Sequence, residues 1–509
     1  MRRIIILTFA ILLVLTLTAC GERDDSLTWQ NQYSLGSRYM YEGDYENAII
    51  IFTAATETDP TREDAYLGLA NAYAKTGDME QAVQVLIEAL DNVNDTSEIQ
   101  RQLDSWTLVN WGSCGDNVEW RLYTCGTLKI TGSGPMYDYD NPTEVPWYKK
   151  LIEDVEIEEG ITSIGAGAFY GDSLISVTIP STVNSIGNSA FRACINLTSI
   201  TIPSSVTDIG IYAFEDCYSL TEIIVDKGNH YYCSIDGVLF TADKTTLITY
   251  PILKSGADYT VPISVTSIGS SAFRGCNNLT SVIMQPSVTH IGMYAFNECK
   301  SLTSVVIPSS VISIGEAAFG WCSNLTDITI PFGVNSIGVQ AFSYCSSLTS
   351  ITIPASVAGI GEQAFVDCEK LASITVDSGN PYYSSVDGVL FSADKTQLIA
   401  YPAGKSDTVY VIPDFVNDIE RCAFSWCGNL TSVIIPSNVT NFGDSVFFGC
   451  NLTSIAIPSS LTRIETNAFF ACNVDNVYFE GSEAEWTRLI DDYNSRSFEF
   501  GSATVHFNS

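Results

Sequence analysis

Positive charge is scarce in this 509-residue chain: 24 lysines and arginines stand against 58 aspartates and glutamates, a formal net charge of −34. A surface of this sign repels nucleic acid and anionic membranes. Histidine is scarcer still, and His230, His290 and His506 have no metal-ligand spacing to one another. The composition therefore argues against a nucleic-acid partner, and we expect neither a metal site nor a cofactor.

Catalytic motifs are also scarce. Gly171-Asp-Ser-Leu174 resembles the nucleophile motif of GDSL hydrolases, but no histidine has an aspartate three residues before it, as the partner motif of those enzymes requires. The sequence contains no phosphate-binding glycine loop and no zinc-protease helix. Carboxylate pairs can still assemble in the fold, which a sequence does not display. We expect Ser173 not to be catalytic and the protein not to be an enzyme.

After Leu17 the sequence contains no run of 18 consecutive apolar residues, the length that would indicate a transmembrane helix. The single run before it follows Arg2 and Arg3 and is too short for a spanning helix, which is typical of a signal peptide. Leu17-Thr-Ala-Cys20 fits a bacterial lipobox, in which the chain is cut before the cysteine and its thiol takes a diacylglycerol. An ordinary secretory signal with a chance cysteine is the alternative.

We therefore predict a lipoprotein signal peptide at 1–20, lipidation at Cys20 and a polar tether at 21–28. The protein would then be extracytoplasmic and lipid-anchored to the bacterial cell envelope. A Cys20→Ala variant should lose lipid labelling.

What the chain does contain is a repeat. Eleven phenylalanines follow one another at 22 or 23 residues, apart from two gaps of 59, each of which equals one repeat plus 36 residues. A fixed period of this length is typical of a solenoid, whose units bury their apolar faces only by stacking. The phenylalanines are Phe169, Phe191, Phe214, Phe273, Phe296, Phe319, Phe342, Phe365, Phe424, Phe447 and Phe469.

Each unit begins with alternating apolar and small polar residues, the pattern of a half-buried strand, as in Leu197, Ile200 and Ile202. A proline such as Pro203 ends that strand. A second apolar pair and a glycine follow, and we expect the Ala-Phe segment to form a short turn of helical or 3₁₀ type. Stacking of the units predicts a parallel sheet along one face.

Residues 150 to 509 resemble the BspA-like leucine-rich repeat family of bacterial surface proteins, whose units read L-x-x-I-x-I-P-x-S-V-x-x-I-G-x-x-A-F-x-x-C. The resemblance implies an α+β protein with a right-handed leucine-rich repeat solenoid at 151–476. It implies an N-terminal β-hairpin cap at 106–150 and a C-terminal cap at 477–509, where Ser482-Glu-Ala-Glu485 predicts a capped helix. Family members are surface-attached and bind macromolecules, which implies adhesion to an extracellular protein or glycan.

A different period governs residues 29–105. Leu35 and Leu69, and likewise Gly43 and Gly77, are 34 residues apart, a spacing that resembles tetratricopeptide repeats. We expect paired helices with these glycines in the turns, and a covering helix capped by Ser97. The module is either a spacer or a partner-binding groove. In the second case the protein is an architectural envelope scaffold, which is our alternative function.

Cysteine occurs 15 times, and ten cysteines fall three residues after a repeat phenylalanine. Equivalent side chains in stacked strands lie about 4.8 Å apart and point the same way, without the crossed geometry of a disulfide. We predict a ladder of free, buried thiols, with Asp172 in the equivalent place of the first unit. The ten are Cys194, Cys217, Cys276, Cys299, Cys322, Cys345, Cys368, Cys427, Cys450 and Cys472.

The two gaps hold insertions at 226–257 and 377–408 that share nearly the same sequence. Each is predicted to be a β-hairpin with Ala-Asp-Lys-Thr at its turn, forming an alternative coil. Their tyrosines either bind a sugar or a protein or fill the core of the extra coil. They are Tyr231, Tyr232, Tyr382 and Tyr383.

The outward positions of the strands are mostly serine and threonine, which any solvated sheet face needs. One outward row becomes apolar around the first insertion and again after the second. Either the hairpins cover these rows, or the rows contact a macromolecule. The residues are Ile224, Ile283 and Val306, and then Val411, Ile434, Ala456 and Tyr478.

Overall fold

The computed structural model describes residues 28–465, 467–494 and 503–507, so Cys20 lies outside the described residues. These form two compact units. One contains the described residues up to 113 with 119–130 and 152–155, and the other contains the rest. None of the described helices combines the length and the apolar character that crossing a bilayer requires.

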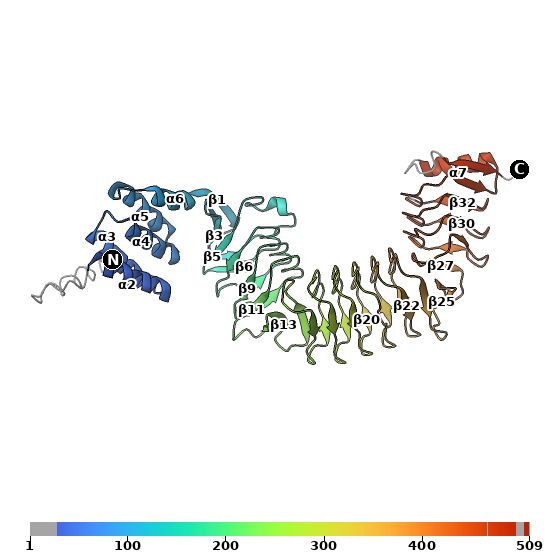
Figure 1. The fold of residues 1–509 in the computed structure, drawn as a ribbon, viewed down its shortest axis with the longest axis horizontal. Coiled ribbons are helices and arrows are strands. Elements are labelled where there is room, and N and C mark those ends of the chain that lie inside the picture. Colours follow the sequence, from blue (N-terminus) through green and yellow to red (C-terminus); the bar gives the residue numbers. More distant parts are fainter. Residues whose placement is uncertain (1–27, 466, 495–502, 508–509) are drawn as a thin grey trace, which may run out of the picture. The chain divides into compact units, whose positions relative to one another are not determined.

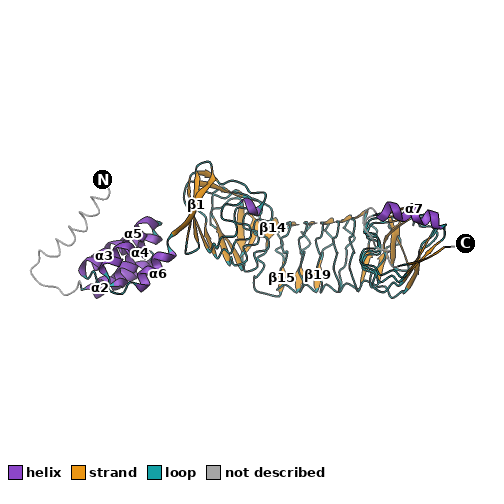
Figure 2. Ribbon diagram, turned by 90° about the horizontal axis from the view of Figure 1, so that it is seen from above, coloured by secondary structure: helices purple, strands orange, loops and turns teal. Residues whose placement is uncertain are grey.

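Five described helices of the first unit pack in sequence order, each against the next (Figure 2). Alanines such as Ala48 and Ala82 are fully buried between them. Gly36 and Gly68 lie against the ring of Phe52, where an added Cβ would come within 3 Å of ring carbons. The predicted helical hairpins are therefore confirmed. The helices are α2 (Trp29–Glu42), α3 (Tyr45–Thr58), α4 (Glu63–Lys75), α5 (Met79–Asn92) and α6 (Ser97–Ser105).

The glycines in the turns recur with the same 34-residue period as the helices. Gly43 and Gly77 have φ of 76° and 83°, the left-handed conformation that glycine adopts without strain, as predicted for the turns. Helix α6 buries Ile99 against the preceding helices, so it does cover them. Ser97, however, is the first residue of α6, and its N–H and hydroxyl donate to Asp95. The prediction that Ser97 is the N-cap was therefore wrong.

The hairpin expected after the helices is present as strands β2 (Val118–Tyr123) and β3 (Thr127–Gly132), and β1 (Leu108–Gly115) is a third strand next to β2 in the same sheet. Within the first unit, Lys129 Nζ donates to the Gly77 carbonyl oxygen at 2.6 Å. Cys114 and Cys125 are both free thiols.

Most coils of the second unit contain a leading strand, from the Leu-x-x-Ile-x-Ile segment, and a short trailing strand, from the second apolar pair (Figure 1). Both kinds pair in parallel with their equivalents in the next coil, one repeat further along the chain. The leading strands do not form one unbroken sheet as expected. They separate between β7 and β9 and at both insertions, and residues 326–330 contain no strand.

The leading strands are β5 (Asp154–Ile157), β7 (Ser176–Thr178), β9 (Ser199–Ile202), β11 (Glu222–Val225), β15 (Asp258–Thr260), β17 (Ser281–Ile283), β19 (Ser304–Val306), β22 (Ser350–Ile353), β24 (Ser373–Val376), β28 (Val409–Val411), β30 (Ser432–Ile434), β32 (Ser454–Ile457) and β34 (Asn476–Phe479). The trailing strands are β6 (Ile161–Ile164), β8 (Ser185–Ile186), β10 (Asp208–Ile209), β16 (Ser267–Ile268), β18 (His290–Ile291), β20 (Ser313–Ile314), β21 (Ser336–Ile337), β23 (Gly359–Ile360), β29 (Asp418–Ile419), β31 (Asn441–Phe442) and β33 (Arg463–Ile464). Strand β4 (Gly134–Pro135) and the 3₁₀ helix η2 (Pro142–Glu144) precede them.

The C-terminal end matches its prediction. Helix α7 (Glu483–Asn494) starts with a capping box, in which the Ser482 N–H donates to Glu485 Oε2 at 2.9 Å. Trp486 and Leu489 of α7 are buried in the solenoid core. The last strand, β35 (Thr504–Phe507), pairs with β34 in parallel.

The Ala-Phe segment is neither an α-helix nor a 3₁₀ helix, contrary to the prediction. Its backbone N–H groups alternate: in one coil the N–H groups of Arg192 and Cys194 donate three residues back, while those of Phe191 and Ala193 donate to the next coil. The residues two before and two after the phenylalanine have positive φ in coil after coil, as at Ser189 and Ala193. This alternation gives the backbone a hydrogen-bonded ladder between coils at the turn.

The repeat phenylalanines are buried and stack ring on ring along the core. Around Phe319 the ring centroids lie 5.2 Å from Phe296 and 5.5 Å from Phe342, with rings nearly parallel. Tyr250 and Tyr401 take the place of the phenylalanine within the insertions, where each stacks on the next repeat phenylalanine, a substitution that the sequence analysis missed. Each insertion is therefore one long coil, as the predicted alternative coil requires.

The cysteine ladder is confirmed, because its cysteines are free and nearly all buried. The structure adds the reason for cysteine: each thiol lies within reach of the aromatic residue's carbonyl in the preceding coil, as for Cys299 Sγ and Phe273 O at 2.9 Å. Burial raises the pKa of Cys299 and of Cys345 to about 12, so these thiols stay protonated donors.

Asp172 starts this ladder with a carboxyl group that is 7% exposed and whose Oδ2 has no hydrogen-bond partner among the described residues. Burial raises its pKa to about 7, against about 3.9 in an unfolded chain. Folding therefore favours its protonated form, and this group lowers stability as pH rises from about 4 to 7.

We expect Asp172→Asn to raise the free energy of unfolding at pH 8 by on the order of 3 kcal/mol and to change it little at pH 4. Urea unfolding at both pH values measures the difference. The exposed Asp258→Asn is the control. Equal effects of Asp172→Asn at the two pH values would contradict the assignment.

Candidate functional site

The outward apolar positions form two patches that the strand register defines. The middle patch contains Ile283 and Val306, which are paired neighbours on β17 and β19 and are 43% and 55% exposed. Ile224 is exposed too, but its strand β11 pairs with β9, where Thr201 is its partner. The middle patch therefore consists of two aliphatic side chains, with Ile224 apart from them.

The C-terminal patch is longer. The register places Val411, Ile434, Ala456, Tyr478 and His506 next to one another on five consecutive strands, from β28 to β35. Val411, Ile434 and Tyr478 are each more than 40% exposed, and the Tyr478 and His506 rings stack at 4.8 Å. Neighbouring strands lie about 4.8 Å apart, so this patch is a continuous stripe across five strands.

The insertions leave these patches exposed, which excludes the alternative in which the hairpins fold over the rows. The third strand of the first insertion instead pairs in parallel with trailing strand β16, through Thr246 and Leu247. The second insertion pairs with β29 in the same way. Each insertion continues the trailing side of the solenoid and leaves Ile283 and Val306 exposed.

Each insertion has three strands rather than one hairpin. The predicted Ala-Asp-Lys-Thr turn joins the second to the third, and a further turn at Asp236-Gly237, with φ of 49° and 76°, joins the first to the second. Asp-Gly between short strands is a strong hairpin signal that could have identified this turn from the sequence. The strands are β12 (Tyr232–Ile235), β13 (Val238–Thr241), β14 (Thr246–Thr249), β25 (Tyr383–Val386), β26 (Val389–Ser392) and β27 (Gln397–Ala400).

The four candidate tyrosines separate into two kinds. The hydroxyls of Tyr232 and Tyr383 each accept a trailing-strand N–H, from Ile209 and Ile360, at 2.9 Å. These two rings are half-buried and structural. Tyr231 and Tyr382 are each 54% exposed and stay predictions as contact residues.

An asparagine fixes each insertion to the preceding coil, a role the sequence analysis missed. In the first insertion, Asn229 Nδ2 donates to the carbonyls of Pro203 and Val206, and its Oδ1 accepts the N–H groups of Tyr231 and Tyr232. Asn380 makes the same four bonds in the second insertion. The asparagine that precedes each tyrosine pair therefore has a structural role.

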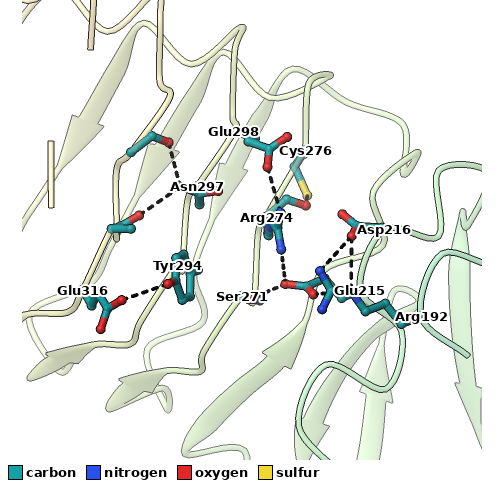
Figure 3. Close-up of polar contacts among 12 residues, drawn as sticks. Arg192, Glu215, Asp216, Ser271, Arg274, Cys276, Tyr294, Asn297, Glu298 and Glu316 are labelled. Atoms are coloured by element: carbon teal, nitrogen blue, oxygen red, sulfur yellow. Dashed lines mark hydrogen bonds and ion pairs between the residues drawn. The ribbon is translucent and has the colours of Figure 1, made fainter. Parts of the chain in front are cut away.

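A buried ion-pair cluster at the first insertion was also missed. The Glu215 side chain is 2% exposed and lies between two arginines, 2.9 Å from Arg192 Nε and 2.6 Å from Arg274 Nη1 (Figure 3). Arg274 also reaches Glu298 at 2.8 Å, and Arg192 reaches Asp216 at 3.4 Å. Spacing could not indicate this cluster, because the insertion separates Glu215 from Arg274 in the sequence.

The hydrolase-like string Gly171–Leu174 lies in the loop after Phe169, in phase with the repeat. Asp172 and Leu174 are buried in the repeat core, and Ser173 is a half-buried loop residue between them. Among the described residues, no cluster of three or more histidine, cysteine, aspartate or glutamate side chains could hold a metal ion.

Comparison with known proteins gives matches to two repeat families. Residues 146–252, 253–378 and 406–492 match the BspA type leucine rich repeat region in six copies. Residues 39–103 match a tetratricopeptide repeat. No curated protein matches the chain.

Solved structures similar to this chain are leucine-rich repeat proteins of bacteria. A leucine rich cell surface protein from Faecalibacterium prausnitzii is 26% identical, with 76% of this chain and 98% of that chain covered and a TM-score of 0.38. A leucine-rich repeat protein from Eubacterium ventriosum is 25% identical, with 74% and 73% covered and a TM-score of 0.32. One from Bacteroides ovatus is 22% identical, with 78% and 99% covered and a TM-score of 0.35.

The family matches cover well over half of the chain, and their repeat is the one whose phenylalanines, cysteines and strands stack in register in the second unit. The chain belongs to the family of BspA-type leucine-rich repeat proteins, and it has a tetratricopeptide-like repeat region before the solenoid.

Proposed function

We propose that this protein is a lipid-anchored, extracytoplasmic binding protein that attaches to another macromolecule through the outward face of its solenoid. The observation that supports this most is the C-terminal patch, a stripe across five adjacent strands in which Val411, Ile434 and Tyr478 are exposed. Exposed apolar rows on an otherwise serine- and threonine-rich face are typical of interaction surfaces. Family membership and the lipobox at Cys20 support the surface location.

The chemistry of the two patches favours a protein over a glycan as the partner. Val306, Val411 and Ile434 are aliphatic and offer no flat ring for a sugar to stack on. Tyr478 adds an amphipathic ring of the kind enriched at protein interfaces. The partner is therefore a protein with a complementary apolar surface, and adhesion is the role.

The test captures partners on the chain from residue 21 onward, with host matrix proteins, cell-wall glycans and envelope extract offered in parallel. We expect retention of an extracellular protein, and at least a tenfold loss when Ile434→Asp and Tyr478→Asp are combined, because charge at the patch centre opposes burial. The matched control is Thr352→Asp with Thr375→Asp, on the same outward row of β22 and β24. Equal loss in both double variants would contradict the proposed surface.

Capture of envelope proteins alone, undiminished by the patch variants, would favour the architectural scaffold instead. Anchoring is tested separately. We expect Cys20→Ala to release the protein from the membrane fraction and to end labelling by a radiolabelled fatty acid. Retained labelling would contradict the lipid anchor.

A further inference from the structure

The ladder of hydrogen bonds between coils stops at the first insertion. In ordinary coils the N–H groups two before, at and two after the phenylalanine donate to carbonyls of the next coil, as Ser271, Phe273 and Gly275 do. In the coil before the insertion these groups belong to Tyr212, Phe214 and Asp216. Among the described residues, none of these three N–H groups has an acceptor.

The opposite wall is incomplete in the same way. In an ordinary coil, the carbonyl of the residue three before the phenylalanine accepts an N–H from the preceding coil, as Met293 O accepts the Ser271 N–H. Ser270 is the equivalent residue in the coil of Phe273. No described group donates to the Ser270 carbonyl. The buried Arg274 Nε also lacks an acceptor within the described part of the chain. Donors on one wall and an acceptor on the other thus face the same gap.

This gap is a cavity of about 210 Å³. Tyr212, Phe214 and Asp216 line it on one side, and Ser270 and Arg274 line it on the other. One water needs roughly 10–15 Å³ by this kind of measure, so there is room for a molecule of many atoms. Beside the cavity, Arg274 spans from its own coil to Glu215 (Figure 3).

The second insertion provides an internal comparison. Gln363, Phe365 and Asp367 repeat the three N–H groups, again without an acceptor among the described residues. There, however, Gln363 Nε2 contacts Cys422 Sγ at 2.9 Å, and the cavity is only about 20 Å³, the room of one or two waters. Val366 and Ser425 stand where the first insertion has Glu215 and Arg274.

We propose that the cavity at the first insertion binds a short, uncharged or basic peptide segment in extended form. In ordinary coils such as that of Phe273, these N–H groups donate to peptide carbonyls of a neighbouring turn, so a peptide backbone matches both walls. A concave arrangement of backbone N–H groups can also bind an anion. Here Arg192 and Arg274 are outnumbered by Glu215, Asp216 and Glu298, so an anion is disfavoured.

The site is separate from the two apolar patches and does not depend on the proposed function. Binding is tested with the full chain and acetyl-Ala-Ala-Ala-amide, an uncharged peptide, with sodium acetate as the anionic comparator. Hydrogen exchange of backbone amides is the readout, for residues 211–217 and, as reference, for 362–368. We expect the peptide to bind with a dissociation constant on the order of 1 mM and to slow exchange at 211–217 alone.

Ser270→Trp, which places a large ring on an exposed lining residue, should weaken peptide binding at least tenfold. Its matched control is Arg421→Trp, the equivalent exposed position at the second insertion, which should change binding less than twofold. Thermal unfolding checks that both variants fold. Equal slowing by acetate would overturn the peptide assignment, and so would unchanged exchange at 211–217.

Discussion

Truncating Phe319 to alanine is expected to lower the free energy of unfolding of the solenoid by about 4 kcal/mol, because it removes a fully buried ring and leaves a cavity. Phe319 lies in the middle of the longest stacked run, between Phe296 and Phe342. Its carbonyl also lies within reach of the Cys345 thiol, 3.1 Å away. A lost ring therefore weakens contacts in both neighbouring coils.

Urea unfolding followed by far-UV circular dichroism measures this change. The matched control is Phe332→Ala, because Phe332 is 73% exposed and outside the stack. We expect less than about 0.5 kcal/mol from the control, as for most surface substitutions. Similar midpoints for the two variants would show that the ring stack is not what stabilises the coils.

Glu215→Gln should lower the free energy of unfolding by about 3 kcal/mol, because removing the buried carboxylate takes away part of the charge that compensates the two arginines. Glutamine keeps the size of the side chain but leaves Arg192 and Arg274 without their shared partner. The same urea experiment measures it. Glu298→Gln, at a side chain that is 34% exposed, is the control and should cost less than about 1 kcal/mol.

The second insertion suggests a rescue. It has Ser343, Val366 and Ser425 at the positions of Arg192, Glu215 and Arg274, so the same backbone folds there without the charges. We expect the triple variant Arg192→Ser, Glu215→Val and Arg274→Ser to be more stable than Glu215→Gln alone, as is common when whole buried ion networks are replaced. A triple variant less stable than the single one would contradict this reading of the cluster.

The sequence predicted those parts of the fold that a period fixes. Phe319 and Cys345 recur at a constant spacing, so their stacking and burial follow from the repeat itself. The Ala-Phe segment was wrongly predicted to be helical because the spacing of apolar residues carries no information on φ. Its residues with positive φ include Trp321 and Tyr344 as well as glycines. No residue type marks that backbone.

The site was less predictable. The outward rows could be predicted from the alternation of apolar and polar residues in the strands. Ile283 and Val306 are paired and exposed, as the alternative of a contact surface requires. Whether an insertion covers an outward row depends on which strand of the solenoid it pairs with. The first insertion pairs with β16 through only two residues, one of them Leu247, and so short a pairing leaves almost no signal in the sequence. The contact of Glu215 with Arg274 arises only because a long coil brings their turns together.

Cross-linking of the intact chain to its captured partner, with the linked residues identified by mass spectrometry, tests the central claim most directly. If the outward face of the solenoid is the binding surface, linked or protected residues fall around the C-terminal patch, near Ile434 and Tyr478, and around the middle patch, near Val306. Links confined to helices α2 to α5, with both patches equally accessible in the free and bound protein, would contradict it.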